Sequence, residues 1–230
     1  MNELHYQQER HYWDSIGENA KYVSLSEYDQ KRLNEWINWI GKGVILDIGG
    51  GSGIISSMLM KSDSTQCITL DISYNMLKHS PTTCVQADAI KLPFTDNSID
   101  LIIAAAFLHH IPQKEKEFIE ECWRVLKKEG RIIGYDPNGK CLQNIVFMGE
   151  NTVFRLSLFS PDERPIDPAL LKLQFEYFGF KSFNYKTFSF FNSKMTLFEW
   201  IQRFIINPLA KGMLKERLDR WFYWEAYKDQ

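Results

Sequence analysis

The sequence predicts an α/β fold built around a doubly wound, mostly parallel β-sheet. Short β-branched runs alternate with helical segments from Gly43 onward, which is typical of such sheets. A glycine-rich turn joins the first of these runs directly to a helix, as at the ligand-binding edge of an α/β fold. With 230 residues the chain is long enough for one well-packed domain and short for two, so we expect a single domain over residues 1–230.

Five strands and three helices are predicted for the core, which we place at residues 43–137. The predicted strands are the apolar runs Val44–Ile48, Cys67–Asp71, Thr83–Gln86, Leu101–Ala105 and Arg131–Tyr135. The predicted helices between them are Gly53–Lys61, Asn75–His79 and Lys114–Lys128. In the last of these, the residues at helical spacing that predict a buried face are Phe118, Ile119, Cys122, Val125 and Leu126.

Two flanking segments are predicted to form a cap. Residues 1–42 should be two helices, the second starting with the capping pattern Ser24 to Glu27 and ending at Gly41. Residues 138–230 should begin with a long insertion at Gly139–Asp167, followed by a helix at Pro168–Tyr177 and a strand at Lys181–Phe191. Helical structure, broken at Pro208, is then predicted for Thr196–Arg220, and a closing strand for Trp221–Tyr227. This predicted cap, inserted after the fifth strand and near the C-terminus, is rich in aromatic residues: Phe147, Phe154, Phe159, Phe198, Trp200 and Phe204.

Composition argues against several classes of function. The formal net charge of -2 provides no positive field for a polyanion, so nucleic acid is not an expected partner. The four cysteines form no CxxC pair and have no metal-ligand spacing with histidine, so we expect reduced, mostly buried thiols, no metal site and a cytoplasmic protein. The polar N-terminus and the lack of a long apolar run predict a soluble chain.

The glycine-rich turn has the form Asp47-Ile-Gly49-Gly-Gly51-Ser-Gly53 and indicates a nucleoside ligand. Glycines at such a turn let a ligand approach the backbone closely. A dinucleotide fingerprint starting at Gly49 would require a third glycine or alanine where this chain has Ile54. The alternating glycines behind an acidic residue therefore favour a ligand other than a dinucleotide.

The pattern acid-x-Gly-x-Gly-x-Gly resembles the first motif of the Rossmann-like, class I, S-adenosylmethionine-dependent methyltransferases. Further segments resemble that family in order and spacing: Asp71 at the end of the second strand, Ala87-Asp-Ala-Ile-Lys-Leu-Pro-Phe after the third, Ser98-Ile-Asp-Leu-Ile-Ile-Ala-Ala-Ala-Phe-Leu-His-His-Ile at the fourth, and Arg124-Val-Leu-Lys-Lys-Glu-Gly-Arg before the fifth. The resemblance covers residues 43–137. It implies S-adenosyl-L-methionine as cofactor and S-adenosyl-L-homocysteine as product.

The resemblance also implies which residues contact the cofactor. Asp47, Gly49 and Gly51 would lie at its methionine end. The expected residues around the ribose and adenine are Asp71, Ile72, Met76, Asp88, Ala89 and Ile90. Ala104 and Ala105 would lie beneath the sulfonium. Tyr12, Trp13 and Tyr22 resemble the aromatic N-terminal segment that folds over the cofactor in related enzymes, although simple packing is an alternative use.

His109 and His110 are the candidate bases for methyl transfer. They follow the fourth strand, and Asp136 lies at the equivalent edge after the fifth. A neutral imidazole can take a hydroxyl proton, and a carboxylate beside it stabilises the imidazolium. The arrangement resembles methyltransferases that modify hydroxyls of sugars and natural products. The alternatives are a pocket-wall role for the histidines and a turn role for Asp136 ahead of Pro137.

The expected acceptor is a small molecule, possessing an aromatic ring or a sugar and methylated on oxygen. Ala105-Ala-Phe-Leu lacks the Asn/Asp-Pro-Pro-aromatic element of enzymes that methylate DNA bases. Alternatives are an N- or C-methyltransferase acting by proximity, a cofactor-binding scaffold, and a nucleotide-dependent oxidoreductase. The basic stretch Lys211 to Arg220 could instead lie on a membrane as an amphipathic helix. We expect a monomer or a homodimer.

Overall fold

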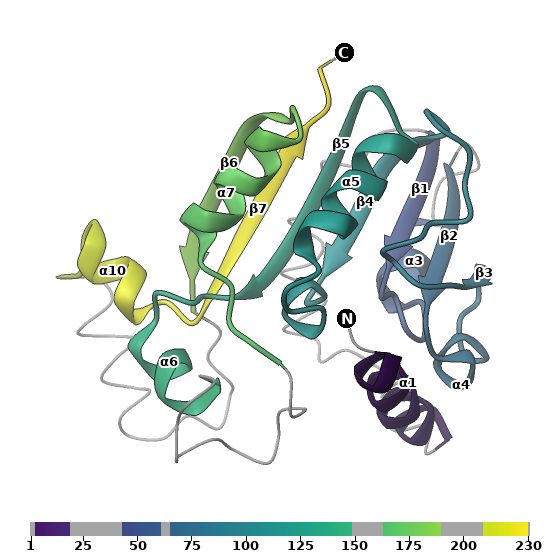
Figure 1. Ribbon diagram of the computed structural model, residues 1–230, viewed down its shortest axis with the longest axis horizontal. Coiled ribbons are helices and arrows are strands. Elements are labelled where there is room, and N and C mark those ends of the chain that lie inside the picture. The colour runs from purple at the N-terminus through teal and green to yellow at the C-terminus, as the bar shows by residue number, and fades with distance from the viewer. Residues whose placement is uncertain (1–2, 19–42, 61–64, 149–162, 190–208, 230) are drawn as a thin grey trace.

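A seven-stranded sheet forms the centre of the molecule (Figure 1). The structure is a computed structural model and describes residues 3–18, 43–60, 65–148, 163–189 and 209–229. The strands are β1 (Gly43–Ile48), β2 (Thr65–Asp71), β3 (Thr83–Gln86), β4 (Ile99–Ala105), β5 (Leu126–Pro137), β6 (Lys181–Phe188) and β7 (Trp221–Tyr227). Their order is β3-β2-β1-β4-β5-β7-β6. The first five are parallel, and β7 pairs antiparallel with both β5 and β6. The predicted α/β class and mostly parallel sheet are confirmed.

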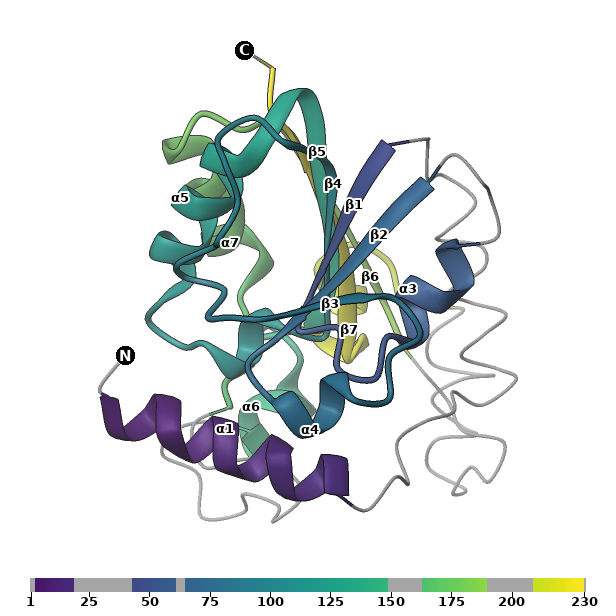
Figure 2. The same ribbon diagram turned by 90° about the vertical axis from the view of Figure 1, so that its right-hand side faces the viewer.

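Helices lie on both faces of this sheet, as Figure 2 shows with α5 and α7 on one side and α3 on the other. The helices are α1 (Glu3–Glu18), α3 (Ile54–Leu59), α4 (Tyr74–Leu77), α5 (Glu115–Val125), α6 (Leu142–Met148), α7 (Pro168–Tyr177) and α10 (Met213–Leu218), with a 3-10 turn, η1 (Leu108–His110). The predicted helix at Pro168–Tyr177 has the bounds of α7. Asp167 caps it by accepting a hydrogen bond from the backbone N–H of Ala169.

The core explains why β4 is apolar from Leu101 to Ala105, after Asp100 near its start. Ile102 and Ala104 belong to the larger buried cluster, which includes Phe118 of α5 and Phe175 of α7. Leu101 and Ile103 belong to a second cluster with Leu59 of α3. Because neighbouring side chains of a strand point to opposite faces, both faces of β4 are covered, and an uninterrupted hydrophobic run is the expected sequence.

The last two strands extend the sheet beyond β5. Trp224 of β7 is buried and crosses β5 at Gly134, where an added Cβ would lie 2.2 Å from the indole ring. The predicted strand Trp221–Tyr227 has the bounds of β7. The predicted strand starting at Lys181 forms β6, which ends at Phe188, short of the predicted Phe191. Residues 190–208 lie outside the described ranges.

Much of the predicted cap also lies outside the described residues. This holds for the second N-terminal helix, for Tyr22 and for the aromatic residues predicted for the cap, except Phe147, which is half-buried on α6. The predicted helical stretch up to Arg220 is described from residue 209, where α10 exposes Met213 and Leu214. Three of the four cysteines are buried and all four are free thiols. Within the described ranges, no helix is long and apolar enough to cross a membrane.

Candidate functional site

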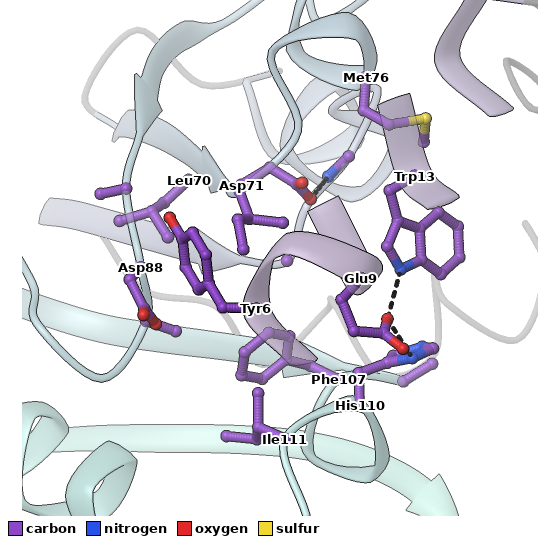
Figure 3. Close-up of a pocket in the computed structure, with 16 residues that line it drawn as sticks. Tyr6, Glu9, Trp13, Leu70, Asp71, Met76, Asp88, Phe107, His110 and Ile111 are labelled. Atoms are coloured by element: carbon purple, nitrogen blue, oxygen red, sulfur yellow. Dashed lines mark hydrogen bonds and ion pairs between the residues drawn. The ribbon is translucent and has the colours of Figure 1, made fainter. Parts of the chain in front are cut away.

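A pocket opens at the carboxyl ends of the central parallel strands, beneath α1 (Figure 3). Ligands of open α/β sheets bind at this edge. Its lining residues are Tyr6, Glu9, Trp13, Gly49, Gly51, Leu70, Asp71, Ile72, Met76, Ala87, Asp88, Ala89, Ala106, Phe107, His110 and Ile111. The list contains many of the residues that the sequence assigns to the cofactor, and it adds residues from α1 and from the turn after β4.

The glycine-rich turn after β1 forms one wall of the pocket. Gly49 and Gly51 have φ values of 66° and 53°, which side chains rarely adopt. A Cβ on Gly49 would also lie 2.4 Å from the ring of Phe107. The backbone N–H groups of Gly49 and Gly50 donate to the carbonyl of Leu70 at 2.8 and 3.2 Å, which ties the turn to the end of β2. The two glycines therefore leave the pocket open beside the backbone.

Asp71, at the end of β2, lines the pocket with its carboxylate held by two backbone amides. Gly51 N–H donates to Oδ2 at 2.9 Å, and Ser73 N–H donates to Oδ1 at 2.8 Å. A carboxylate has about four acceptor positions, so both oxygens can still accept from a ligand. Burial raises the pKa of Asp71 to about 6, and the bonds from Ser73 and Gly51 oppose that rise. The group can thus be ionised at neutral pH.

Asp47 does not line the pocket, although the sequence places it among the cofactor contacts. It is buried under the glycine turn, where Ser56 Oγ donates to its Oδ2 at 2.7 Å. Thr69 Oγ1 in turn donates to Ser56 Oγ at 2.8 Å. Burial raises the pKa of Asp47 to about 6. In this position Asp47 joins β1, α3 and β2 behind the turn.

The remaining expected adenine contacts are divided between the pocket and its support. Ile72, Met76, Asp88 and Ala89 line the pocket. Ile90 does not, but its backbone N–H donates to Asp88 Oδ1 at 3.1 Å. Burial raises the pKa of Asp88. In Figure 3 Tyr6 of α1 lies beside Asp88 and Leu70, so this helix closes the third-strand end of the pocket.

Ala104 and Ala105 of β4 also lie behind the pocket instead of at its surface. Ala104 is fully buried in the larger core cluster, and Ala105 packs against the smaller one. The lining at this point consists of the next two residues, Ala106 and Phe107. Ala106 has a φ of 52°, and its N–H donates to the carbonyl of Tyr135 at 2.7 Å. β4 thus ends at Ala105, where the predicted strand ends, but the pocket is lined by the turn after the strand.

His109 and Asp136 form a buried pair behind the pocket. His109 Nδ1 is 3.0 Å from Asp136 Oδ1, which also accepts from the His109 backbone N–H at 3.2 Å. Trp224 Nε1–H donates to Asp136 Oδ2 at 3.0 Å. Burial raises the pKa of Asp136 to about 8 and lowers that of His109 to about 3. His109 does not line the pocket.

His110 does line the pocket and lies between two buried carboxylates. Its Nδ1 is 3.4 Å from Glu163 Oε1 and 3.6 Å from Glu9 Oε2. Trp13 Nε1–H donates to the same oxygen of Glu9 at 3.2 Å, and Figure 3 shows Trp13, Glu9 and His110 in sequence along one wall. The imidazole rings of His109 and His110 are 4.1 Å apart between centroids. The two histidines thus belong to one cluster, with only His110 facing the pocket.

Helix α1 is held over the pocket by its C-terminal half. Asp14 Oδ1 accepts from Ser73 Oγ at 2.6 Å and from Asn75 N–H at 3.2 Å. Gly17 packs so closely on α4 that an added Cβ would lie 2.6 Å from the carbonyl carbon of Asn75. Of the aromatic residues expected to fold over the cofactor, Trp13 lines the pocket and Tyr12 is exposed.

Sequence reasoning missed several residues of this site, in particular Tyr6, Glu9, Phe107 and Glu163. Glu9 is 7 % exposed and Glu163 is 6 % exposed, which is unusual for glutamate. Glu9 is followed four residues later by Trp13, the spacing of neighbours on one helix face, and this was the available signal. Glu163 has no comparable local pattern.

Part of the chain is similar in sequence to known proteins. Residues 46–134 match the family model described as a methyltransferase domain. The human arginine-hydroxylase NDUFAF5, mitochondrial, is 35% identical over 135 residues, which are 56% of this chain and 39% of that protein. The ubiquinone/menaquinone biosynthesis C-methyltransferase UbiE of Pseudomonas paraeruginosa is 34% identical over 102 residues, which are 39% of this chain and 40% of that protein. The chain thus spans about two fifths of the length of these curated relatives.

Among solved structures, a SAM-dependent methyltransferase from Archaeoglobus fulgidus has a similar fold. The TM-score is 0.68 at 22% identity, covering 90% of this chain and 96% of that one. The matched sequence region contains the glycine turn, Asp71, Asp88, His109 and His110, and the similarity in fold covers more of the chain than that region. Residues 46–134 thus match a methyltransferase domain, and the chain has the fold of a solved S-adenosylmethionine-dependent methyltransferase.

Proposed function

We propose that this protein transfers the methyl group of S-adenosylmethionine to an oxygen atom of a small-molecule acceptor. The observation that supports this most is the position of His110, which lines the pocket together with Gly49, Gly51 and Asp71 and is flanked by two carboxylates. An acceptor hydroxyl must lose its proton as the O–CH3 bond forms and the S–CH3 bond breaks. A base at the pocket wall is suited to accept that proton.

In this proposal His110 takes the proton and its neighbours support the charge that results. An imidazolium formed at His110 is stabilised by Glu9 and Glu163, whose oxygens lie 3.6 and 3.4 Å from its Nδ1. His109, with Asp136 behind it, packs against the His110 ring and acts as a positioning residue. The products are the methyl ether, S-adenosylhomocysteine and one proton, which leaves from His110 to solvent.

The cofactor contacts in this proposal follow the lining of the pocket. The Asp71 carboxylate would accept hydrogen bonds from the ribose hydroxyls, and Asp88 would accept from the adenine amine. The backbone at Gly49 and Gly51 would approach the methionine end. Behind the lining of the pocket, Asp47 would fix the glycine turn and Ile90 would fix Asp88. Ala104 and Ala105 would fix the end of β4.

The acceptor that suits this pocket is apolar over much of its surface. Tyr6, Trp13, Phe107 and Ile111 supply rings and aliphatic carbon at the wall beneath α1. This favours an aromatic or sugar-bearing acceptor, as in natural product biosynthesis. The four free thiols are in keeping with a cytoplasmic location.

Methylation of nitrogen or carbon is the second candidate. Two buried carboxylates beside the pocket would attract an amine in its protonated form, and the amine would give up that proton before its lone pair takes the methyl group. One of the matched relatives is named a C-methyltransferase. In either case proximity and alignment of the acceptor with the methyl group would supply most of the rate.

A third candidate keeps the cofactor pocket without methyl transfer. One matched relative is named a hydroxylase, and a fold of this kind does not by itself determine the reaction. A scaffold or a different reaction would leave S-adenosylmethionine unconsumed. Conversion of S-adenosylmethionine to S-adenosylhomocysteine therefore separates these candidates from the first two.

The test is methyl transfer from S-adenosylmethionine labelled in its methyl group. We expect the purified protein to label the small-molecule fraction of a cell extract, and not its protein or nucleic acid. With the labelled acceptor isolated, His110→Ala should lower kcat by about 100-fold or more, as expected for loss of a general base. His11→Ala, an exposed histidine on α1, is the matched control. Label found only in protein, or unchanged turnover of His110→Ala, would contradict the proposal.

A further inference from the structure

Four side chains that ligate metals in other proteins converge at the wall of the pocket. His109, His110 and Glu163 each offer a ligand atom, and these atoms all lie within 4.8 Å of one another. Glu9 adds a carboxylate oxygen 3.6 Å from His110. The four residues come from α1, from η1 and from the segment before α7, so the chain brings together donors that are far apart in the sequence.

The separation between His110 and Glu163 resembles that between ligands that share one ion, and the ligand atoms of His109, His110 and Glu163 all lie within 4.8 Å of one another. Around a tetrahedral zinc, ligand atoms about 2.0–2.1 Å from the metal lie about 3.3 Å from one another. His110 Nδ1 and Glu163 Oε1 are 3.4 Å apart. A charge-assisted hydrogen bond between such groups is shorter, about 2.7–2.9 Å. The carboxylates thus stand beside the imidazole at a distance that a shared cation would require.

Asp136 holds His109 in the orientation that metal-binding histidines have. A ligating histidine usually donates its second ring N–H to a carboxylate, which fixes the ring. Here Nδ1 of His109 is 3.0 Å from Asp136 Oδ1, so Nε2 is the nitrogen directed away from that carboxylate. Asp136 is itself fixed by Trp224 Nε1–H and by the His109 backbone N–H. The support for one ligand is therefore already in place.

We propose that His109, His110 and Glu163, with Glu9 as a fourth ligand, bind a divalent first-row transition metal ion such as Zn²⁺, Fe²⁺ or Mn²⁺. Two imidazoles with one or two carboxylates are a donor set for these ions, whereas Mg²⁺ and Ca²⁺ prefer oxygen ligands alone. The cysteine count and the sequence spacing led us to expect no metal. Sequence spacing does not reveal this cluster, because Glu9, the two histidines and Glu163 are far apart along the chain and come together only in the fold.

The inference goes beyond the proposed function, because a bound cation changes what His110 does. In the metal-free protein His110 is the base of the proposed function; with an ion bound, His110 would be a ligand and the ion would activate the acceptor in its place. A coordination position facing the pocket would instead take an oxygen of the acceptor, and the cation would lower the pKa of that hydroxyl so that its proton leaves to solvent. The same site would join α1 to the rest of the pocket, since Glu9 is the only one of the four ligands on that helix.

The test is Co²⁺ binding to untagged, EDTA-treated protein, followed by visible absorption and by calorimetry with Zn²⁺. We expect one ion per chain, a rise in Tm with Zn²⁺ that EDTA reverses, and at least a tenfold loss of affinity in His110→Ala and in Glu163→Gln. Asp136→Asn, which does not touch the ion, should weaken binding by about 10- to 100-fold. His11→Ala, an exposed histidine, should bind as the wild type does.

Binding of S-adenosylhomocysteine by each variant shows that the variant is folded. If a variant does not fold, titration of the wild type with Co²⁺ and Zn²⁺ alone decides whether the metal site exists. Absence of one-to-one binding of Co²⁺ and Zn²⁺ to the wild type, or equal binding by both ligand variants, overturns the metal site. Methyl transfer that persists after EDTA treatment in such a protein leaves the proposed function standing. One-to-one metal binding without any methyl transfer would overturn the proposed function and leave the metal site standing.

Discussion

The two halves of the pocket are built in different ways. The half formed by the ends of β1, β2 and β3 consists of short contiguous segments, each of which turns directly after a strand. The half around His110 is assembled from α1, η1 and the segment before α7. Along the chain, α1 lies about 100 residues before η1, and Glu163 lies about 50 residues after it. The first half is a local consequence of its sequence, and the second depends on the whole fold.

This difference indicates which half of the pocket sets cofactor affinity and which half sets turnover and acceptor choice. Backbone amides hold Asp71 by two hydrogen bonds within the same half of the pocket. His110 is instead flanked by Glu9 and Glu163, each from another segment. We therefore expect substitutions in the first half to act on cofactor affinity, and substitutions in the second to act on turnover and acceptor choice.

Asp71→Ala should have the largest effect on cofactor binding. The variant removes the acceptor of the ribose hydroxyls and also leaves the N–H groups of Gly51 and Ser73 without their carboxylate. We expect the Kd for S-adenosylhomocysteine to rise by about 30- to 100-fold, corresponding to about 2–3 kcal/mol. Calorimetry measures it, with the exposed Glu120→Ala as control. An unchanged Kd would contradict the role given to Asp71.

Cofactor affinity should also depend on pH through Asp71. Burial raises the pKa of this carboxyl to about 6, and only its ionised form accepts from two hydroxyls without donating. Affinity should be highest above pH 6 and fall on acidification, by about tenfold between pH 7 and pH 5 for a single group of this pKa. Titrations across that range test this. Asp71→Asn should lack this dependence, and a wild-type affinity that is constant down to pH 5 would refute it.

The smallest of these effects is expected for Trp13→Ala on α1. The indole lines the pocket and donates to Glu9 at 3.2 Å, so its loss removes apolar contact and loosens one carboxylate. We expect a Kd for S-adenosylhomocysteine that is about three- to fivefold higher, because α1 stays attached through Asp14. Gln8→Ala, an exposed position on the same helix, serves as the control. A change as large as that of Asp71→Ala would mean that α1 belongs to the first half of the pocket.

The fold was predictable from the sequence because its signals are local. The five parallel strands follow apolar runs with turn residues at each end, and α7 starts at Pro168 after the capping residue Asp167. The register of β7 against β5 was not predictable, because it depends on Trp224 packing over Gly134. β5 also extends beyond the predicted strand, from Leu126 to Pro137. Its first residue, Leu126, pairs with Ile99 of β4, and its last two, Asp136 and Pro137, pair with β7.

The candidate site was predictable only in part. Gly49, Gly51, Asp71 and Asp88 lie in motifs, and the structure places all four at the pocket. His109 and His110 could not be distinguished from sequence, because their different environments arise from Asp136 and from two distant glutamates. Asp47 carries the motif but lies beneath the turn, since the spacing of a motif does not reveal which side of the backbone a side chain takes.

The central claim is that the pocket binds S-adenosylmethionine as a methyl donor. One measurement tests it most directly: calorimetric titration of the purified protein with S-adenosylmethionine, S-adenosylhomocysteine and NADH. We predict one equivalent of each sulfur compound bound, no binding of NADH, and loss of affinity in Asp71→Ala. Binding of NADH with no binding of S-adenosylmethionine or S-adenosylhomocysteine would contradict the claim.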